Sequence, residues 1–434
     1  MRIVDLIEKK KKGLKHTREE IEFIIDSLMN GTAADYQISA WLMAVYFNGM
    51  DIEETTHLTR AMINSGEILD LSMISDNIID KHSTGGVGDK ITIILIPILQ
   101  ALGVPIVKLS GRGLGFTGGT IDKLESIPNF NCALPMEEIL KQVKEIGAAI
   151  ASQTAKLAPA DGKLYALRDV TATVDSMPLI ASSVVSKKIA SGANNIILDV
   201  KYGSGAFMKT AEEAKQLSEL MVQVGKNLGK KITAVVSAMN EPLGRAVGNS
   251  VEIVETIEFL KGNTSKDLEE ITYKLASLSV LKMDMANSED EAVQMIKKVV
   301  EDGSALEKFR VLIEKQGGNS NIIDDYTLLP NAAQIVTINA TESGYVESID
   351  ALCIAKASKI LGAGRDKKTD DIDYSVGVYL NKKTGDFVQI GDTLATLYVN
   401  ADNNLSTAEI LVKNAFEVKS EQPEYKSLIY AVIE

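Results

Sequence analysis

Cysteine, histidine and long apolar runs are all scarce in this chain of 434 residues. Only Cys132 and Cys353 occur, far apart and outside any CxxC or Cys/His cluster, so neither a disulfide framework nor a zinc site is predicted. No apolar stretch reaches the roughly 18 residues of a membrane helix, and the charged N-terminus lacks the apolar core of a signal peptide. We therefore expect a cytoplasmic protein that neither spans a membrane nor is secreted.

Positive charge is also in deficit, since 46 lysines and arginines face 59 acidic residues and give a net charge of -13. Nucleic acids and anionic membranes favour basic surfaces, so neither is expected as a main partner. Hydrophobic residues make up 45% and charged residues 24%, which are ordinary values for a soluble globular protein. An anionic ligand must therefore be bound by a few local groups.

The length of the chain exceeds the size at which one hydrophobic core usually stops growing, which predicts two or three domains. The first part indicates helices, because TREE at 17–20 and DIEE at 51–54 both have the spacing of a capping box. Apolar residues at helical intervals follow both boxes. Such stripes are typical of a core or a subunit interface, so this segment is predicted to be a small helical domain.

From about residue 77 the sequence repeats a pattern of apolar run, glycine-rich turn and helix-like stretch. The apolar runs are NIIDKHS, VPIVKLS and NIILDVK. Strand, turn and helix in this order predict parallel βαβ units, in which ligands bind beyond the carboxyl ends of the strands. The stretch ITIILIPILQALG contains Pro97 and β-branched residues, yet its length and the preceding glycine-rich loop favour a helix.

The predicted organisation is multidomain α/β. We expect a helical domain at 1–70, to which residues 160–192 return, and an α/β phosphate-binding domain at 71–159 and 193–330. Short runs with turn residues predict β-hairpins in a third, β-rich α+β domain at 331–434. Within it, GDFVQIGDTLATLYV resembles the hammerhead of biotinyl and lipoyl carrier domains without their MKM lysine, and is interpreted as structural.

The turn DKHSTGGVGD at 80–89 concentrates a lysine, a histidine, two hydroxyls and three glycines. Glycine lets backbone N–H groups approach an anion, and the helix that follows adds positive potential, so this turn is a candidate phosphate site. It is neither a GxxxxGK[ST] loop nor a strict GxGxxG, so ATP and dinucleotide interpretations are weak. His82 lies in this turn, whereas His16 and His57 fall in segments expected to be exposed and inert.

Two further segments supply polar side chains of the same kind. KLSGRGLGFTGGT contributes Lys108, Ser110 and Thr120 around more glycines. The stretch RDVTATVDSMPLIASSVVSKK contributes Arg168, Ser183 and Lys187, of which the last two are i and i+4 on one helical face. Lys163 and Lys188 are expected to lie on solvated helix faces.

The segments DKHSTGGVGDK, LSGRGLG, TGGT, DKLESIP, KLYALRDVTATVDS, PLIAS, LDVK and GSGAFMK resemble the signature segments of the thymidine and pyrimidine-nucleoside phosphorylase family, in order and spacing. The resemblance runs over essentially the whole chain. It implies reversible phosphorolysis of uridine, thymidine and deoxyuridine to free base and (deoxy)ribose 1-phosphate. It also implies a homodimer formed through the helical domain, with the active site in a cleft between the helical and α/β domains.

The resemblance also implies roles for individual residues. The phosphate site of the family matches Lys81, Ser83, Thr92, Ser110 and Thr120, with Lys108 close by. The base-binding residues match Arg168, Ser183 and Lys187, and His82 corresponds to the histidine beside the glycosidic bond. Arg168, Lys187 and His82 are the catalytic candidates, because negative charge accumulates on the departing pyrimidine.

Three positions depart from the family pattern or vary within it. Phe116 stands where the family commonly has a histidine that contacts the closing cleft. Thymidine-specific relatives have an apolar residue at the position of Lys108, so the lysine predicts tolerance of a ribose 2′-hydroxyl, although it can equally face phosphate or solvent.

The third departure is Lys90, which replaces a threonine ligand of a monovalent cation such as potassium. The remaining ligands match backbone oxygens of Gly88, Leu243 and Ala246 and the carboxylate of Glu255. A lysine can bring its own ammonium to Glu255, or it can simply point into water. No cofactor is required by the implied reaction.

Three alternatives remain open at this point. A thymidine-specific phosphorylase differs only in sugar and base preference. An enzyme similar to anthranilate phosphoribosyltransferase would share the helical and α/β domains but would need carboxylates that bind magnesium. A catalytically silent binding or growth-factor-like protein is disfavoured, because the set of polar residues from Lys81 to Lys187 is intact.

Overall fold

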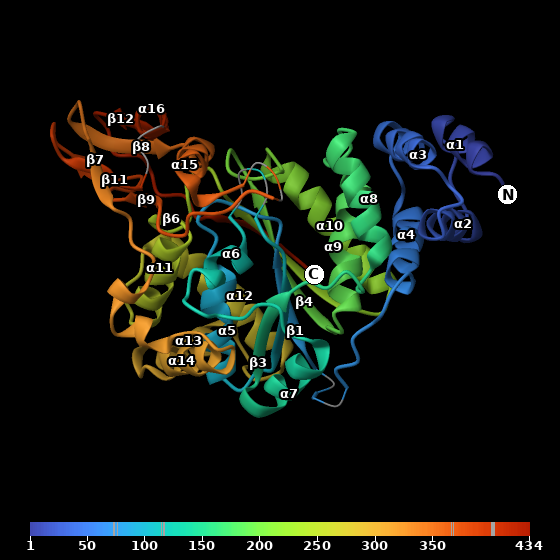
Figure 1. Cartoon of the computed structure of the whole chain (residues 1–434), viewed down its shortest axis with the longest axis horizontal. Helices are drawn as coiled ribbons and strands as arrows, with labels where there is room; N and C mark the ends of the chain where they lie inside the picture. The colour runs from blue at the N-terminus through green and yellow to red at the C-terminus, as the bar shows by residue number, and fades with distance from the viewer. Residues whose placement is uncertain are drawn as a thin grey trace.

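The computed structural model describes residues 1–72, 74–75, 77–113, 115, 118–365, 367, 369–400 and 404–434. Figure 1 shows a helical unit on the right, a central α/β unit and a strand-rich C-terminal unit at the upper left. Within the described residues, no helix combines the length and the apolar composition needed to cross a membrane.

The helical unit combines the N-terminal helices with two helices from the middle of the chain. Its elements are α1 (Ile3–Lys11), α2 (Arg18–Met29), α3 (Asp35–Asn48), α4 (Ile52–Asn64), α8 (Pro159–Val170) and α9 (Met177–Ala190). Both predicted capping boxes are confirmed, with Thr17 capping α2 and Asp51 capping α4. The core includes the fully buried Trp41 together with Leu164 of α8 and Leu179 of α9. Burial of these apolar side chains joins the two parts of the chain.

The prediction that His16 is exposed is wrong. The connection between α1 and α2 folds over Trp41, whose indole Nε1 donates a hydrogen bond of 3.1 Å to His16 Nε2. The histidine is only 4% exposed as a result. It therefore serves the core of the helical unit and lies away from the candidate site.

A six-stranded sheet forms the centre of the α/β unit. Its strands are β1 (Ile79–Ser83), β2 (Ile106–Ser110), β3 (Ala148–Ser152), β4 (Asn195–Tyr202), β5 (Lys231–Ala238) and β13 (Ile429–Ile433), in the order β13-β5-β4-β1-β2-β3. The first five run parallel, as the βαβ pattern predicts, and β13 pairs antiparallel with β5. The carboxyl ends of β1 and β2 therefore meet at one edge of the sheet, where the two glycine-rich turns follow.

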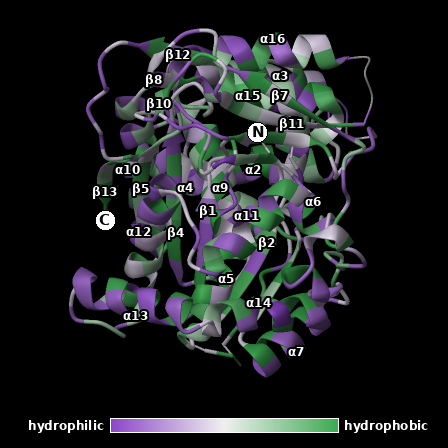
Figure 2. Ribbon diagram, turned by 90° about the vertical axis from the view of Figure 1, so that its left-hand side faces the viewer, coloured by the Kyte–Doolittle hydropathy of each residue, from purple (hydrophilic) through white to green (hydrophobic). Residues whose placement is uncertain are grey.

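Helices cover this sheet. They are α5 (Ile91–Ala101), α6 (Thr120–Glu125), α7 (Met136–Ile146), α10 (Ala211–Asn227), α11 (Ser250–Leu260), α12 (Lys266–Lys282), α13 (Glu289–Glu301) and α14 (Ser304–Lys315). The predicted helix containing Pro97 is confirmed as α5. Every residue from Ile91 to Gln100 is buried, and Figure 2 colours most of this helix as hydrophobic. Tertiary burial therefore outweighs the poor helix propensity of isoleucine and proline.

The C-terminal unit contains two small sheets, ordered β10-β8-β12 and β6-β9-β11-β7. Its elements are η1 (Ser320–Ile323), η2 (Tyr326–Leu328), β7 (Gln334–Asn339), β8 (Gly344–Ile349), α15 (Ala351–Ser358), η3 (Lys359–Ala363), β9 (Gly377–Leu380), β10 (Phe387–Val388), β11 (Thr393–Val399), α16 (Leu405–Ala415) and β12 (Phe416–Lys419). The expectation of simple hairpins, in which consecutive strands pair with each other, is wrong. Successive strands alternate between the two sheets, so β7 pairs with β11 and not with β8.

Two strands cross between the α/β and C-terminal units. β6 (Ala246–Gly248) comes from the α/β part of the sequence but pairs with β9, and β13 leaves the C-terminal part to extend the central sheet. We propose the division into helical, α/β and C-terminal domains that the sequence predicts, except that β6 joins a sheet of the C-terminal domain and β13 joins the sheet of the α/β domain. Hydrogen bonding of β6 and β13 across the boundary favours a firm attachment of the C-terminal unit to the α/β unit.

Candidate active site

A cavity of about 350 Å³ lies between the glycine-rich turns after β1 and β2 and the helices α8 and α9. It brings together residues as far apart in the sequence as His82 and Leu217. The predicted site residues that line it are His82, Ser83, Thr92, Lys108, Ser110, Thr120, Arg168, Ser183 and Lys187. The cavity therefore has one wall made of turns of the α/β unit and one made of helices of the helical unit.

Lys81 is the exception among the predicted phosphate residues, because it lies beneath the first turn and does not line the cavity. Its side chain is fully buried, and its Nζ lies 3.5 Å from Thr92 Oγ1. The same nitrogen is 3.7 Å from Asp199 and 3.9 Å from Asp89. Lys81 lies two residues before the carboxyl end of β1, on the same face as Ser83, so its side chain lies below the strand end that meets the cavity. Lys81 is thus placed to act on the cavity through Thr92 and the turn.

The Asp89 carboxylate, at the end of this turn, is held in its charged form. Burial opposes ionisation, but the ammonium groups of Lys81 and Lys201 keep the pKa of Asp89 well below its usual range. Lys201 also forms an ion pair of 2.8 Å with Asp199 and donates to Ser237 Oγ at 3.0 Å. The positive charge under the first turn is consequently balanced by buried negative charge.

The second glycine-rich turn lines the cavity through Gly111, Gly113, Gly118 and Gly119. Its backbone can approach a ligand closely because these residues have no side chain. Phe116, the position where the family commonly has histidine, lies outside the described residues.

Arg168 enters the helical wall from the end of α8 and is only 2% exposed. Its guanidinium donates to the carbonyl oxygens of Thr173, Leu179 and Val174, at 3.3, 3.2 and 2.5 Å. Burial lowers its pKa, with nearby acidic groups opposing the shift. Neutral carbonyl partners fix the orientation of this side chain without cancelling its charge.

Lys187 and Ser183 lie one turn apart on α9, and the Lys187 Nζ donates to Ser183 Oγ at 3.0 Å. A third residue, Asp161, was not foreseen from the sequence. Its Oδ2 forms an ion pair of 2.9 Å with Lys187, while its buried Oδ1 has no hydrogen-bond partner among the described residues. Asp161 therefore fixes the ammonium of Lys187 on the helical side of the cavity.

His82 lies at the carboxyl end of β1 and faces the cavity, half-buried. Burial, reinforced by Lys188 and Lys108, lowers its pKa well below the usual value. The imidazole is therefore neutral at neutral pH and has one N–H to donate.

The prediction of a solvated Lys188 is wrong. This side chain is 4% exposed and forms an ion pair of 2.7 Å with Asp80. Lys108 shares the same carboxylate at 3.7 Å, and burial together with the charge of Lys188 lowers the pKa of Lys108 to about 7. The helix face that carries Lys188 packs on the α/β unit, which the local sequence alone does not indicate.

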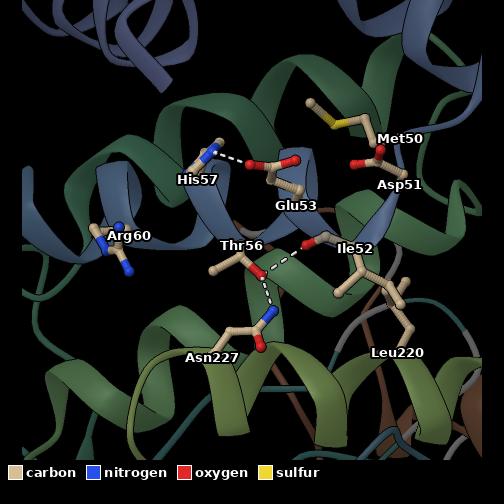
Figure 3. Close-up of a pocket in the computed structure, with 9 residues that line it drawn as sticks. All are labelled: Met50, Asp51, Ile52, Glu53, Thr56, His57, Arg60, Leu220 and Asn227. Atoms are coloured by element: carbon tan, nitrogen blue, oxygen red, sulfur yellow. Dashed lines mark hydrogen bonds and ion pairs between the residues drawn. The ribbon is translucent and has the colours of Figure 1, made fainter. Parts of the chain in front are cut away.

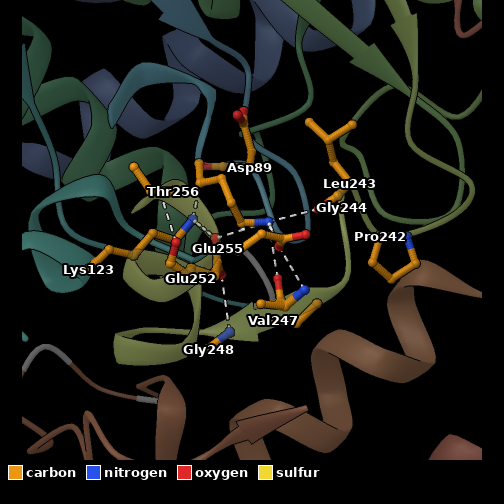
Figure 4. Close-up of polar contacts among 12 residues, drawn as sticks. Asp89, Lys123, Pro242, Leu243, Gly244, Val247, Gly248, Glu252, Glu255 and Thr256 are labelled. Atoms are coloured by element: carbon orange, nitrogen blue, oxygen red, sulfur yellow. Dashed lines mark hydrogen bonds and ion pairs between the residues drawn. The ribbon is translucent and has the colours of Figure 1, made fainter. Parts of the chain in front are cut away.

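Three of the four residues matched to a cation site surround an ammonium group, while the carbonyl of the fourth, Gly88, accepts from the Lys90 backbone N–H at 2.9 Å. Lys90 is fully buried, and its Nζ lies 2.9 Å from the Leu243 carbonyl, 3.2 Å from that of Ala246 and 2.8 Å from Glu255. Figure 4 shows this cluster around Glu255 and Leu243. The oxygens that would hold a monovalent ion are already bonded, so these residues do not fit an additional cation.

A second buried lysine extends the same cluster toward the active site. Lys123 of α6 forms an ion pair of 2.7 Å with Glu252 and donates to the backbone oxygen of Asp89 at 2.9 Å. The Lys90 ammonium lies 3.9 Å from the same glutamate. The cluster thus joins the end of the first glycine-rich turn to α11 through two internal ammonium groups (Figure 4).

Another cavity, of about 790 Å³, opens between α4 and α10 and is drawn in Figure 3. His57 lies there 3.8 Å from Glu53, and the Asn227 amide donates to Thr56 Oγ1 at 3.1 Å. The cavity is wide open to solvent, and the predicted catalytic residues His82, Arg168 and Lys187 line the other cavity. We therefore place the chemistry in the cavity between the two walls.

Several further residues of that cavity escaped the sequence interpretation. Tyr165 stacks near Arg168, with the guanidinium carbon 5.8 Å from the ring centroid. Gln153, Asp175 and Leu217 also line the cavity. Tyr165 and Asp175 stand in the segment KLYALRDVTATVDS, close to Arg168, and this closeness in sequence could have marked them as residues of the site. Nothing in the sequence around Leu217 indicates that it lines the cavity.

Family models cover three successive parts of the chain. Residues 4–66 match the helical bundle domain of a glycosyl transferase family, and residues 75–306 match the a/b domain of that family. Residues 345–419 match the pyrimidine nucleoside phosphorylase C-terminal domain.

Curated relatives are similar over nearly their whole length. The pyrimidine-nucleoside phosphorylase of Staphylococcus haemolyticus is 51% identical over 403 residues, or 93% of each chain. That of Geobacillus stearothermophilus is 47% identical over 430 residues, or 99% of each chain. The crystal structure of anthranilate phosphoribosyltransferase from Thermus thermophilus matches with a TM-score of 0.59 at 18% identity, covering 72% of this chain and 100% of that chain, and shares the fold.

Proposed function

This chain belongs to the pyrimidine-nucleoside phosphorylase family, and we propose that it cleaves pyrimidine nucleosides reversibly with inorganic phosphate. The observation that carries the proposal is a single cavity in which glycine-rich turns with hydroxyl groups face Arg168, Ser183 and Lys187. One wall suits a phosphate ion and the other suits the carbonyl and imide groups of a pyrimidine.

On the phosphate wall, hydroxyl groups and backbone N–H groups surround the anion. Ser83 and Thr92 belong to the first turn and its helix, and Ser110 and Thr120 flank the second turn. Lys81, whose charge is balanced by Asp89 and Asp199, orients Thr92 from below, and Lys108 adds positive potential from the side. Phosphate is in this way held next to C1′ of the sugar. Because both reactants are bound in position, the attack becomes effectively unimolecular.

On the helical wall, the pyrimidine is oriented and its developing charge is stabilised. A phosphate oxygen forms a bond to C1′ while the C1′–N1 bond breaks, and the bonding electron pair leaves with the base. Arg168 and Lys187 donate to the carbonyl oxygens that carry this charge, and Ser183 meets N3. The departing base then takes up one proton, so the products are the free base and the (deoxy)ribose 1-phosphate.

His82 lies between the two walls, at the junction where the glycosidic bond breaks. As a neutral imidazole it donates a hydrogen bond to O2 of the base, and this bond strengthens as negative charge grows on that oxygen. The proton that the base takes up is the one that hydrogenphosphate loses when it becomes the sugar 1-phosphate. No covalent enzyme intermediate is needed.

The test is a panel of uridine, thymidine and deoxyuridine incubated with the purified protein, with and without phosphate and in the presence of a metal chelator. We expect free base to appear only when phosphate is added, and the chelator to leave the rate unchanged. A requirement for pyrophosphate and magnesium in place of phosphate would instead indicate a phosphoribosyltransferase reaction.

The panel also distinguishes broad from thymidine-specific activity. The broad activity is the one we propose, because a lysine at position 108 offers a partner to the ribose 2′-hydroxyl. Negligible cleavage of uridine beside rapid cleavage of thymidine would establish the thymidine-specific alternative.

We further propose a homodimer formed through the helical domain. Exposed apolar side chains on that unit support it: Val4, Leu14, Tyr36, Phe47 and Ile52 are each 45% exposed or more. Exposed apolar side chains grouped on one unit favour an interface. Light scattering gives the mass in solution, and a monomeric mass at micromolar concentration would contradict the proposal. The two free thiols, Cys132 and Cys353, are consistent with the cytoplasmic location that we also propose.

A further inference from the structure

The C-terminal unit touches the active site indirectly, through the outer side of the second glycine-rich turn. Arg365 follows η3 and is only 8% exposed. Its guanidinium Nη2 lies 2.9 Å from Oδ1 of Asp122, in the first turn of α6, and Asp122 is 1% exposed. A buried ion pair thus spans the boundary between the two units.

Asp122 in turn closes the base of the glycine-rich turn. Its Oδ2 accepts a hydrogen bond of 2.7 Å from the backbone N–H of Gly113, and its Oδ1 also lies 3.3 Å from Arg112. The two ends of the turn are packed so tightly that a Cβ atom on Gly119 would overlap both Gly113 and the Asp122 carboxylate. One carboxylate therefore holds Gly113 and Gly119, at the two ends of the turn, in place.

A second contact of the same kind lies alongside. The hydroxyl of Tyr374, in the segment before β9, donates to Glu125 at 3.3 Å, and Glu125 also pairs with Arg112. Burial, helped by the charge of Glu125, raises the pKa of Tyr374, so the phenol remains a neutral donor. The C-terminal segment is itself anchored, because the Asn249 side chain donates to the Ala363 carbonyl at 2.9 Å.

The inner side of the turn is the wall of the cavity. Gly111, Arg112, Gly113, Gly119 and Thr120 line the cavity, while Asp122 and Glu125 project from the same stretch of chain toward the C-terminal unit. The outer contacts therefore determine where the inner backbone N–H groups lie.

We propose that Arg365 is a positioning residue for the phosphate wall, acting through Asp122 on Gly113 and Gly119, at the two ends of the second glycine-rich turn. The expected change in the kinetic constants rests on the proposed phosphorolysis. Removal of the Arg365 guanidinium leaves the buried Asp122 carboxylate with only its longer contact to Arg112, a side chain half exposed to water. The carboxylate is then held less firmly, and the Gly113 N–H that it accepts from loses its fixed position. Because the turn faces phosphate and not the base, binding of phosphate is the step that suffers.

The experiment compares Arg365→Ala and Arg365→Lys with a matched control, Arg245→Ala. Arg245 also crosses to the C-terminal unit, but it donates to the backbone carbonyls of Leu380 and Asn381 at 3.0 and 2.8 Å, away from the turn. We expect the KM for phosphate to rise about tenfold in Arg365→Ala while kcat and the KM for uridine change less than twofold. Arg365→Lys should restore most of the phosphate affinity, and the control should resemble the wild type.

A readout without catalysis completes the test. Amide hydrogen exchange of the peptide containing Gly113 should accelerate in Arg365→Ala and not in Arg245→Ala. Equal rises of the phosphate KM in both variants would show a general loosening of the C-terminal unit and overturn the proposal. An unchanged phosphate KM in Arg365→Ala would overturn it as well. Failure of the wild type to cleave nucleosides would instead refute the proposed function, while the exchange result would still decide whether Arg365 orders the turn.

Discussion

The two walls of the cavity handle positive charge in opposite ways. On the helical wall, Arg168 is held by three neutral backbone carbonyls, so its full charge remains available. On the phosphate wall, Lys81 is buried beneath the turn between Asp89 and Asp199, which balance it. The helical wall presents the Arg168 cation directly, although its second cation, Lys187, is paired with Asp161. The phosphate wall presents hydroxyls and backbone N–H groups in front of a compensated cation.

This difference matches what each wall must do during the reaction. The pyrimidine gains negative charge only as the glycosidic bond breaks, so an uncompensated cation there stabilises the transition state more than the bound substrate. Phosphate is charged from the start, and a fully exposed cation would bind substrate and transition state alike. Changes on the helical wall should therefore lower kcat, and changes on the phosphate wall should raise the KM for phosphate.

The largest effect is expected for the residues nearest the departing base. Arg168→Ala and His82→Ala should each lower kcat/KM by about 100-fold or more, the usual scale for a charge stabiliser or a positioned proton donor. Initial rates with saturating phosphate give the values, and Lys163→Ala, an exposed lysine of the same helix as Arg168, serves as the control. Near-normal turnover in both variants would show that neither residue stabilises the departing base, and would contradict the roles assigned to the two walls.

The next effect tests the internal ammonium of Lys90. Lys90→Thr leaves Glu255 buried without its partner and should lower kcat/KM about 30-fold in a buffer with a large organic cation, since breaking a buried pair costs about 3–5 kcal/mol. Potassium should recover most of the activity and raise the melting temperature of this variant, because an ion that binds only the folded state stabilises it.

Two comparisons control the Lys90 experiment. The wild type should be equally active and equally stable in sodium, potassium or an organic cation at matched ionic strength. Lys90→Met fills the site with an apolar chain and should not respond to potassium. Loss of wild-type activity on withdrawal of potassium would mean that a cation site survives beside the lysine.

A smaller effect is expected at Asp161, which contacts Lys187 and not the substrate in our proposal. Asp161→Asn keeps the shape but removes the charge that orients the ammonium, and should lower kcat about tenfold with little change in the phosphate KM. Asp169→Asn, an exposed aspartate on the same helix, is the matched control. A change confined to the phosphate KM would contradict the assignment of Asp161 to the helical wall.

Much of this site could be predicted from the sequence because its chemistry lies in turns. Apolar runs followed by glycine-rich turns predict parallel strands, and parallel strands bring the turns after β1 and β2 to one edge. Ser83, Ser110 and Thr120 could thus be grouped without knowledge of tertiary structure.

The burial of charged residues could not be predicted in the same way. Lys81, Lys188 and Asp161 are ordinary polar residues in their local sequence, and their burial depends on helices and strands from distant parts of the chain. The same reason applies to β13, whose pairing with β5 joins residues nearly two hundred positions apart. Periodicity within one segment carries no information on such partners.

A modest effect is expected on the phosphate wall itself. Ser83→Ala should raise the KM for phosphate about fivefold and leave kcat within twofold, because one hydroxyl contributes about 1 kcal/mol of binding in ground and transition states alike. Titration of phosphate at saturating uridine gives both constants. A fall in kcat without a change in KM would place Ser83 among the groups that act only in the transition state.

The smallest effect concerns Lys108, which lies between the walls with its pKa lowered to about 7 by burial and by the charge of Lys188. Near neutral pH a substantial fraction of this side chain is an uncharged amine, which can both accept a hydrogen bond from a ribose 2′-hydroxyl and donate one. Lys108→Met removes that partner and, by the usual value of one net hydrogen bond, should lower the ratio of kcat/KM for uridine to that for thymidine about threefold.

Taking the ratio separates the two roles of Lys108. Any weakening of phosphate binding affects both nucleosides equally and cancels, whereas a contact with the 2′-hydroxyl affects uridine alone. The two reactions are therefore run at the same phosphate concentration and at pH 7, where the amine and the ammonium are both populated. If both nucleosides lose activity in proportion, Lys108 belongs wholly to the phosphate wall, and the sugar tolerance must come from other residues of the cavity.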